Sequence, residues 1–119
     1  MIGLPPFEDA AQFGPAARQM VDANTTVVAM SGPPLMHGTG CWLGLMFPHM
    51  LGGTSVCWRT AVLNQKRFGA RRADRVSQII IVGDAFAKPL WGLETEPDRW
   101  DTSSLKLMIS SGAIFSRPR

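Results

Sequence analysis

The chain has 119 residues, a formal net charge of +3 and a charged fraction of 18%, below the roughly 25% usual in globular proteins. This length limits the chain to one domain or part of one. Five basic residues and one acidic residue give a net +4 between positions 66 and 75, with one aromatic side chain among them. Such a local excess argues against a nucleic-acid-binding protein, in which basic residues follow a groove and alternate with aromatic ones.

The apolar content is high for so short a chain. Four Trp, six Phe and seven Met are more large apolar side chains than a free-standing domain of this size can readily bury. We therefore expect exposed apolar surface that the rest of a larger protein normally covers.

The cysteines and the apolar runs indicate where the protein resides. Cys41 and Cys57 belong to no CxxC pair, and residues 1–9 contain no secretory signal. The longest apolar run, 41–51, is shorter than the ~20 residues that a membrane span requires. The sequence thus predicts a cytoplasmic protein with free thiols and no membrane span.

The first 24 residues read as a poorly defined lead-in to the domain. A helical turn is expected at 7–13, and Pro15 suits the first position of a helix that ends near Asn24. The apolar face expected for this helix consists of Ala17, Met20 and Val21.

A buried strand, a loop and a helix are predicted next. Residues 25–30 are largely β-branched or apolar, which is typical of a strand buried on both faces, and 31–40 form a loop rich in small residues. The helix at 41–51 should stop at Gly52-Gly53, and Pro48 should kink it or end its regular part near Phe47. Its expected inward face consists of Trp42, Leu45, Met46 and Met50.

The second half alternates between strands and connections. Further strands are predicted at 55–58, 79–82 and 105–109. Residues 60–76 cross between the first two, Gly83-Asp84 turns, and a short helix follows at 86–93. This order predicts an α/β fold, a parallel sheet with helices on both faces. Ligands bind such sheets beyond the carboxyl ends of the strands, here at 31–40, 59–60, 83–85 and 110–113.

Residue chemistry alone leaves the function of these loops open. His37 either lines a pocket or caps the following helix, and Asp84 either serves a site or caps its own helix. Gly38-x-Gly40-x-x-x-Gly44 is a weak dinucleotide fingerprint, which leaves an NADP-dependent oxidoreductase as one hypothesis. No metal-ligand spacing is present, and no residue qualifies as a catalytic nucleophile or general base.

Four segments in order carry a resemblance to a known family. They read PLMHGTG at 34–40, LGGT at 51–54, IIIVGDAF at 79–86 and DTSSLK at 101–106 leading to SSGA at 110–113. In this order they resemble AMP-forming acyl-CoA synthetases, the fatty-acid–CoA ligases of the adenylate-forming superfamily. The resemblance covers about 27–116.

The resemblance implies an ATP-dependent ligase that makes an acyl-adenylate from a fatty or steroid-side-chain carboxylate and transfers the acyl group to coenzyme A. It places His37, Gly38 and Gly40 beside the acyl carboxylate, and Gly83, Asp84 and Phe86 in the wall of the acyl tunnel. It places Ser111, Gly112 and Ala113 against the adenine and the acyl group.

The resemblance also implies that residues 1–119 are an internal fragment of the large AMP-binding N-terminal domain. The phosphate loop with its lysine, the AMP- and Mg²⁺-binding segment, the ribose-binding aspartate and the catalytic lysine of the family have no match here. The crossover at 66–76 also departs from the amphipathic helix of the family. The chain alone is therefore expected to be inactive. The alternative is a stand-alone, non-catalytic nucleotide- or acyl-binding module.

Overall fold

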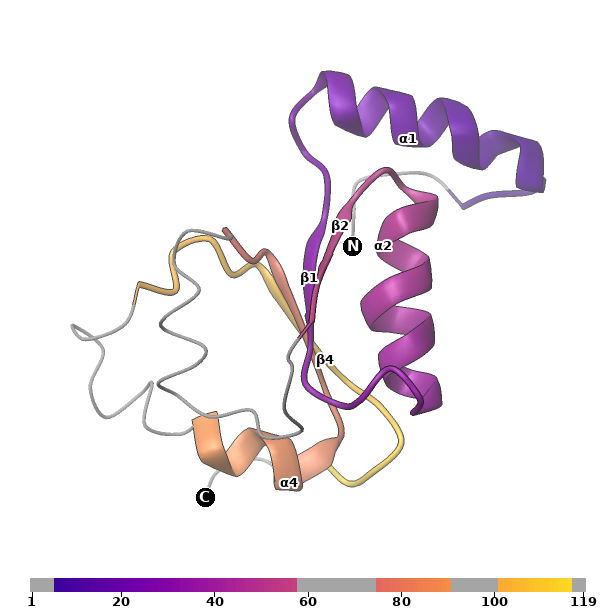
Figure 1. The fold of residues 1–119 in the computed structure, drawn as a ribbon. Helices are drawn as coiled ribbons and strands as arrows, with labels where there is room; N and C mark the ends of the chain where they lie inside the picture. The colour runs from indigo at the N-terminus through magenta and orange to yellow at the C-terminus, as the bar shows by residue number, and fades with distance from the viewer. Residues whose placement is uncertain (1–5, 58–74, 91–100, 117–119) are drawn as a thin grey trace.

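The computed structural model describes residues 6–57, 75–90 and 101–116, and Figure 1 shows its ribbon. Four strands form a parallel sheet in the order β2-β1-β3-β4. Their bounds are Val28–Ser31 for β1, Thr54–Val56 for β2, Gln78–Ile81 for β3 and Leu107–Ser110 for β4. The prediction of an α/β fold with a parallel sheet is confirmed.

The two central strands are buried on both faces. Met30 of β1 pairs with Val56 of β2 and with Ile79 of β3, which in turn pairs with Met108 of β4. Met30 and Ile79 are fully buried. Side chains of a strand alternate between two covered faces, so both strands carry apolar residues at nearly every position. The strand predicted at 25–30 begins three residues later than expected.

One face of the sheet packs against α1, Phe13–Asp22, which follows the short helix η1, Ala10–Gln12. Ala29 of β1 shares this apolar cluster with Ala16 and Met20 of α1 and with Leu51. The prediction that Val21 faces inward was wrong, because the helix is rotated so that Ala16 and Met20 are buried and Val21 is half exposed.

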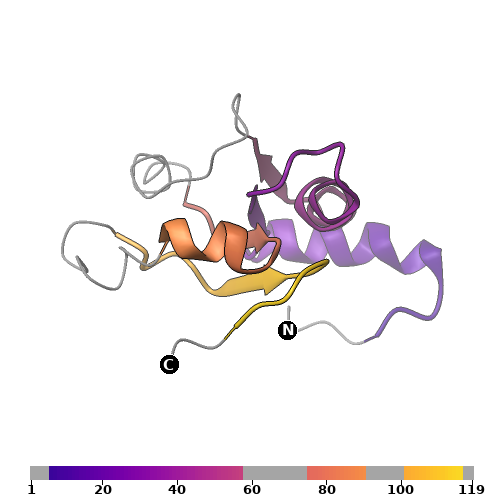
Figure 2. The ribbon, with the colours of Figure 1, turned by 90° about the horizontal axis from the view of Figure 1, so that it is seen from below.

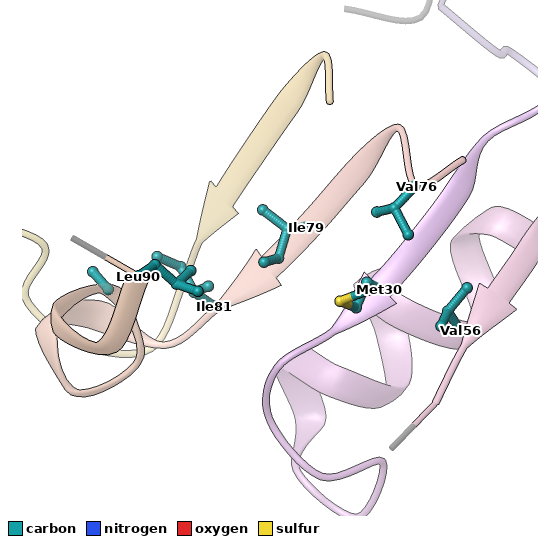
Figure 3. Close-up of a cluster of buried hydrophobic side chains, with 7 residues drawn as sticks. Met30, Val56, Val76, Ile79, Ile81 and Leu90 are labelled. Atoms are coloured by element: carbon teal, nitrogen blue, oxygen red, sulfur yellow. The ribbon is translucent and has the colours of Figure 1, made fainter. Parts of the chain in front are cut away.

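The opposite face packs against α4, Gly83–Ala87, and η4, Lys88–Leu90. Figure 3 shows Leu90 and Ile81 beside each other, with Ile79, Met30 and Val56 continuing the cluster across the sheet. Ala29 and Met30 belong to different clusters, so helices cover both faces. The turn predicted at 83–84 is the start of α4. The helix predicted at 86–93 thus begins three residues earlier, and its last residues lie outside the described part.

The helix after β1 turns its small residues, not its large ones, toward the sheet. Its wide-register part, η2, spans Gly40–Met46, and α2 continues over Phe47–Met50. A Cβ at Gly44 would lie 2.7 Å from Cβ of Ser31. The predicted inward face was therefore wrong: Leu45 is half-buried, Trp42, Met46 and Met50 are exposed, and Trp42 is 63% exposed. The physical reason is the close approach of helix and strand, which only glycine allows.

Pro48 does not end this helix. The preceding turns have the wider π register, in which the Phe47 N–H donates to the Trp42 carbonyl, and the helix continues past Pro48 to Met50. It stops as predicted at the glycine pair: Gly52 has a φ of 71°, and the Gly53 N–H donates to the Pro48 carbonyl at 2.8 Å.

Several apolar side chains are exposed on the described surface. Met36 is 94% exposed and Ile114 is 82% exposed, and Phe115 is also exposed. Within residues 6–57, 75–90 and 101–116, no helix has the length and apolar character to cross a membrane. Trp58 and most of the crossover at 60–76 lie outside the described residues.

Candidate functional site

Three of the predicted loops meet at one edge of the sheet. Because β1, β3 and β4 are parallel neighbours, the segments that follow them leave the sheet at the same edge. Figure 1 shows these segments at the lower end of the sheet, and Figure 2 looks onto that end. The fourth predicted loop, 59–60, lies outside the described residues.

His37 is exposed at the start of the helix that follows β1. Its Nδ1 accepts a hydrogen bond from the Thr39 N–H at 3.2 Å, so Nε2 carries the proton of the neutral ring. The carbonyl of His37 accepts from the Cys41 N–H at 2.9 Å. His37 therefore caps the helix, which satisfies an N–H that would otherwise lack an intrahelical acceptor.

Gly112, from the segment after β4, lies against His37. A Cβ at Gly112 would stand 3.8 Å from Cε1 of His37 and 3.5 Å from Oγ1 of Thr39. Its φ of 88° is a conformation that glycine adopts without strain. The structure thus brings together two predicted site residues that are 75 positions apart in the sequence. Ser111 and Ala113 beside it are exposed.

Gly83 joins the segment after β3 to the segment after β4. Its N–H donates to Oγ of Ser110 at 3.0 Å, and a Cβ in its place would lie 2.8 Å from Cβ of Ala113 and collide with the Ile114 carbonyl. With a φ of 57°, Gly83 allows the chain after β4 to lie directly on the first turn of α4.

Asp84 binds the end of the segment that follows β4. Its N–H donates to the Ile114 carbonyl at 3.0 Å, and its Oδ1 accepts from the Ser116 N–H at 2.8 Å. Hydrogen bonds from the Ser116 N–H and then from the Ser116 side chain hold the pKa of Asp84 below its ordinary 3.8. Desolvation opposes this shift, and the charge of Lys88 contributes least to it. Asp84 thus anchors residues 114–116 to α4, a role for which its own sequence neighbourhood gave no signal.

The other predicted site residues have different surroundings. Gly38 is exposed, with open space around it. Gly40 is buried, and a Cβ there would lie 2.5 Å from the Pro34 carbonyl oxygen, so this glycine serves packing. Phe86 is half-buried and packs against the core cluster under α4. The described edge therefore consists of His37, Thr39, Gly83 and residues 111–114.

The anchor formed by Asp84 should respond to acid. Its lowered pKa means that the carboxylate favours the folded arrangement above the ordinary value of 3.8, and that this contribution is lost as pH falls through the lowered pKa. We expect the Ser116 amide proton resonance to titrate below pH 3.8 in NMR spectra.

The matched variants are Asp84→Asn, which should remove this titration, and Asp22→Asn on the exposed end of α1, which should preserve it. A Ser116 resonance that is independent of pH in the unmodified chain would contradict the anchor.

Across the described ranges, no group of three or more His, Cys, Asp or Glu side chains could hold a metal ion. The chain was also compared with protein-family models, with curated proteins and with solved structures, and none of these comparisons gave a match.

A hollow at the opposite edge of the sheet was not foreseen from the sequence. It has a volume of about 560 Å³ and lies at the amino ends of β1, β3 and β4. Arg75, three residues before β3, and Lys106, immediately before β4, both line it. Gln78 also lines it and is the polar first residue of an otherwise apolar β3. These polar residues at the starts of apolar strands were the feature of the sequence that could have indicated the hollow.

Proposed function

We propose that this chain is part of the AMP-binding N-terminal domain of an acyl-CoA ligase. We further propose that the carboxyl edge of its sheet, where β1, β3 and β4 end, forms one wall of the acyl-adenylate site. The observation that carries the proposal is the position of Gly112 beside His37 and Thr39, which a Cβ at Gly112 would contact at 3.8 and 3.5 Å. These residues come from the first and last of the four segments that resemble the family, and a shared site requires them to be neighbours.

The polar groups of the edge support a bound acyl-adenylate. A Cβ at Gly112 would lie within ordinary contact distance of His37, Thr39 and Val82, so these three residues surround the glycine closely. The hydroxyls of exposed Ser111 and half-buried Thr39 and the ring of exposed His37 provide polar groups at the rim of the edge. The resemblance assigns this edge to the adenine and the adjoining acyl phosphate of the intermediate, and polar groups at the rim support that assignment.

The described residues do not account for every group that the ligase reaction uses. The resemblance assigns residues 111–113 to the adenine of ATP, but none of the described carboxylates forms a group that could hold Mg²⁺. We therefore assign neither Mg²⁺ nor coenzyme A to a described residue. The exposed side chains of Met36, Trp42 and Phe115 are consistent with a surface that other parts of the ligase cover.

A stable sulfamoyl analogue of an acyl-adenylate tests this proposal in calorimetry. We expect saturable binding that is weakened about tenfold, or by roughly 1.4 kcal/mol, in His37→Ala. His49→Ala is the matched control, because His49 is an exposed histidine further along the same helix.

His37→Asn separates binding from helix capping. Asparagine also caps helices, so this variant should recover the thermal stability of the unmodified chain but not its affinity for the analogue. If His37→Asn recovered both the thermal stability and the affinity, His37 would act only as a helix cap, and its proposed part in the site would be wrong. Absence of analogue binding by the unmodified chain would refute the proposal, and equal affinity for free ATP or free fatty acid would favour a stand-alone binding module.

A further inference from the structure

The hollow at the amino edge of the sheet lies at the opposite end of the strands from the candidate acyl-adenylate site. Its walls come from the end of α1 and from the residues that lead into β1, β3 and β4. Met20, Val27 and Leu107 form an apolar part of these walls. Its volume of about 560 Å³ is in the range of small-molecule sites, roughly 300–1,000 Å³.

Hydrogen bonds between segments hold these walls in place. Oγ of Ser77 accepts from the Val28 N–H at 2.9 Å, and the Ser77 carbonyl accepts from the Lys106 N–H at 2.8 Å. Oγ of Ser104 donates to the Val76 carbonyl at 2.8 Å. The approaches to three strands are thereby fixed to one another, so the hollow is formed before any ligand enters.

The polar groups of the hollow favour an anion. Among the described residues that line it, Arg75 and Lys106 carry charge, and none is acidic. Gln78 is only 3% exposed, and its Nε2 has no hydrogen-bond partner among the described residues. A buried amide N–H without an acceptor is unfavourable, and an oxyanion would supply that acceptor.

We propose that this hollow binds a small organic carboxylate. The carboxylate lies between Arg75 and Lys106 and accepts a hydrogen bond from Nε2 of Gln78, while the hydrocarbon part packs on Met20 and Leu107. A guanidinium matches the geometry of a carboxylate, and the apolar wall distinguishes such a ligand from a bare inorganic anion. This inference does not depend on the proposed ligase function.

Hexanoate and its neutral counterpart hexanamide test the charge requirement. In NMR spectra of the ¹⁵N-labelled chain, hexanoate should shift the Gln78 side-chain amide and the backbone amides of Lys106 and Leu107. Hexanamide at the same concentration should not. Equal shifts with both compounds, or no shifts with hexanoate, would overturn the proposal. So would inorganic phosphate binding there as tightly as hexanoate, because the apolar wall would then contribute nothing.

Three variants test the residues themselves. Arg75→Ala, Lys106→Ala and the similarly shaped Gln78→Met should each weaken hexanoate binding about tenfold, the effect of losing one hydrogen bond to a charged group. Arg18→Ala removes an exposed positive charge from α1 and should leave binding unchanged. Wild-type affinity in Gln78→Met would refute the role of the buried amide. His37→Ala should not affect this binding, which separates its outcome from that of the ligase proposal.

Discussion

Replacement of Ile79 by alanine is expected to lower the free energy of unfolding by about 3–4 kcal/mol, the usual cost of truncating a large buried aliphatic side chain. Ile79 is fully buried in the centre of β3 and packs in the cluster with Met30, Val76 and Leu90 (Figure 3). Domains are stable by only about 5–15 kcal/mol, so this single change should remove a large part of the total. Urea unfolding followed by circular dichroism measures it.

The control for this variant is Ile79→Val, which removes one methylene and should cost about 1 kcal/mol. Val21→Ala offers a second control, because half of the Val21 side chain is exposed and its truncation should change the unfolding free energy little. An Ile79→Ala variant as stable as Ile79→Val would show that this cluster is not the core of the sheet.

Replacement of Gly44 by alanine is expected to destabilise the chain by about 2 kcal/mol, although alanine favours helices over glycine by about 1 kcal/mol. The added Cβ would lie 2.7 Å from Cβ and 2.9 Å from Oγ of Ser31. Ser31 is buried in β1, and its hydroxyl donates to the Pro33 carbonyl at 2.7 Å, so it cannot readily move aside. The steric cost therefore exceeds the gain in helix propensity.

Gly38→Ala is the matched control, because Gly38 lies in the helical turn directly before η2. Nothing lies within 4 Å of a Cβ at Gly38, so its replacement should be neutral or stabilising by up to about 1 kcal/mol. Thermal unfolding of both variants decides the sign of each effect. If Gly44→Ala were as stable as Gly38→Ala, the close packing of this helix on β1 would be wrong.

The two proposed binding regions are separable because they occupy opposite edges of one parallel sheet. The carboxyl edge gathers His37, Gly83 and Gly112, and the amino edge gathers Arg75, Gln78 and Lys106. Variants in one set are therefore not expected to alter ligand binding at the other. The acyl-adenylate proposal and the carboxylate proposal can therefore be tested independently of each other.

Local patterns were sufficient for much of the fold. The apolar run at 79–82 indicated a buried strand, and β3 occupies Gln78–Ile81. The glycine pair after residue 51 indicated the end of a helix, and Gly52 adopts the left-handed conformation there. Both features depend on short-range chemistry, burial of consecutive side chains in one case and a positive φ in the other, and the order of elements then implied a parallel sheet.

The sequence by itself therefore determined the parallel α/β class, the strongest strand and the carboxyl-edge location of the candidate loops. Tertiary structure decided which side of each helix is buried, because the distance between helix and sheet, set at Gly44 and Ser31, outweighed the hydrophobicity of Trp42 and Met46. It also decided that Gly112 lies against His37 and that Asp84 binds Ser116. Such contacts join residues far apart in the chain, and no local propensity encodes them.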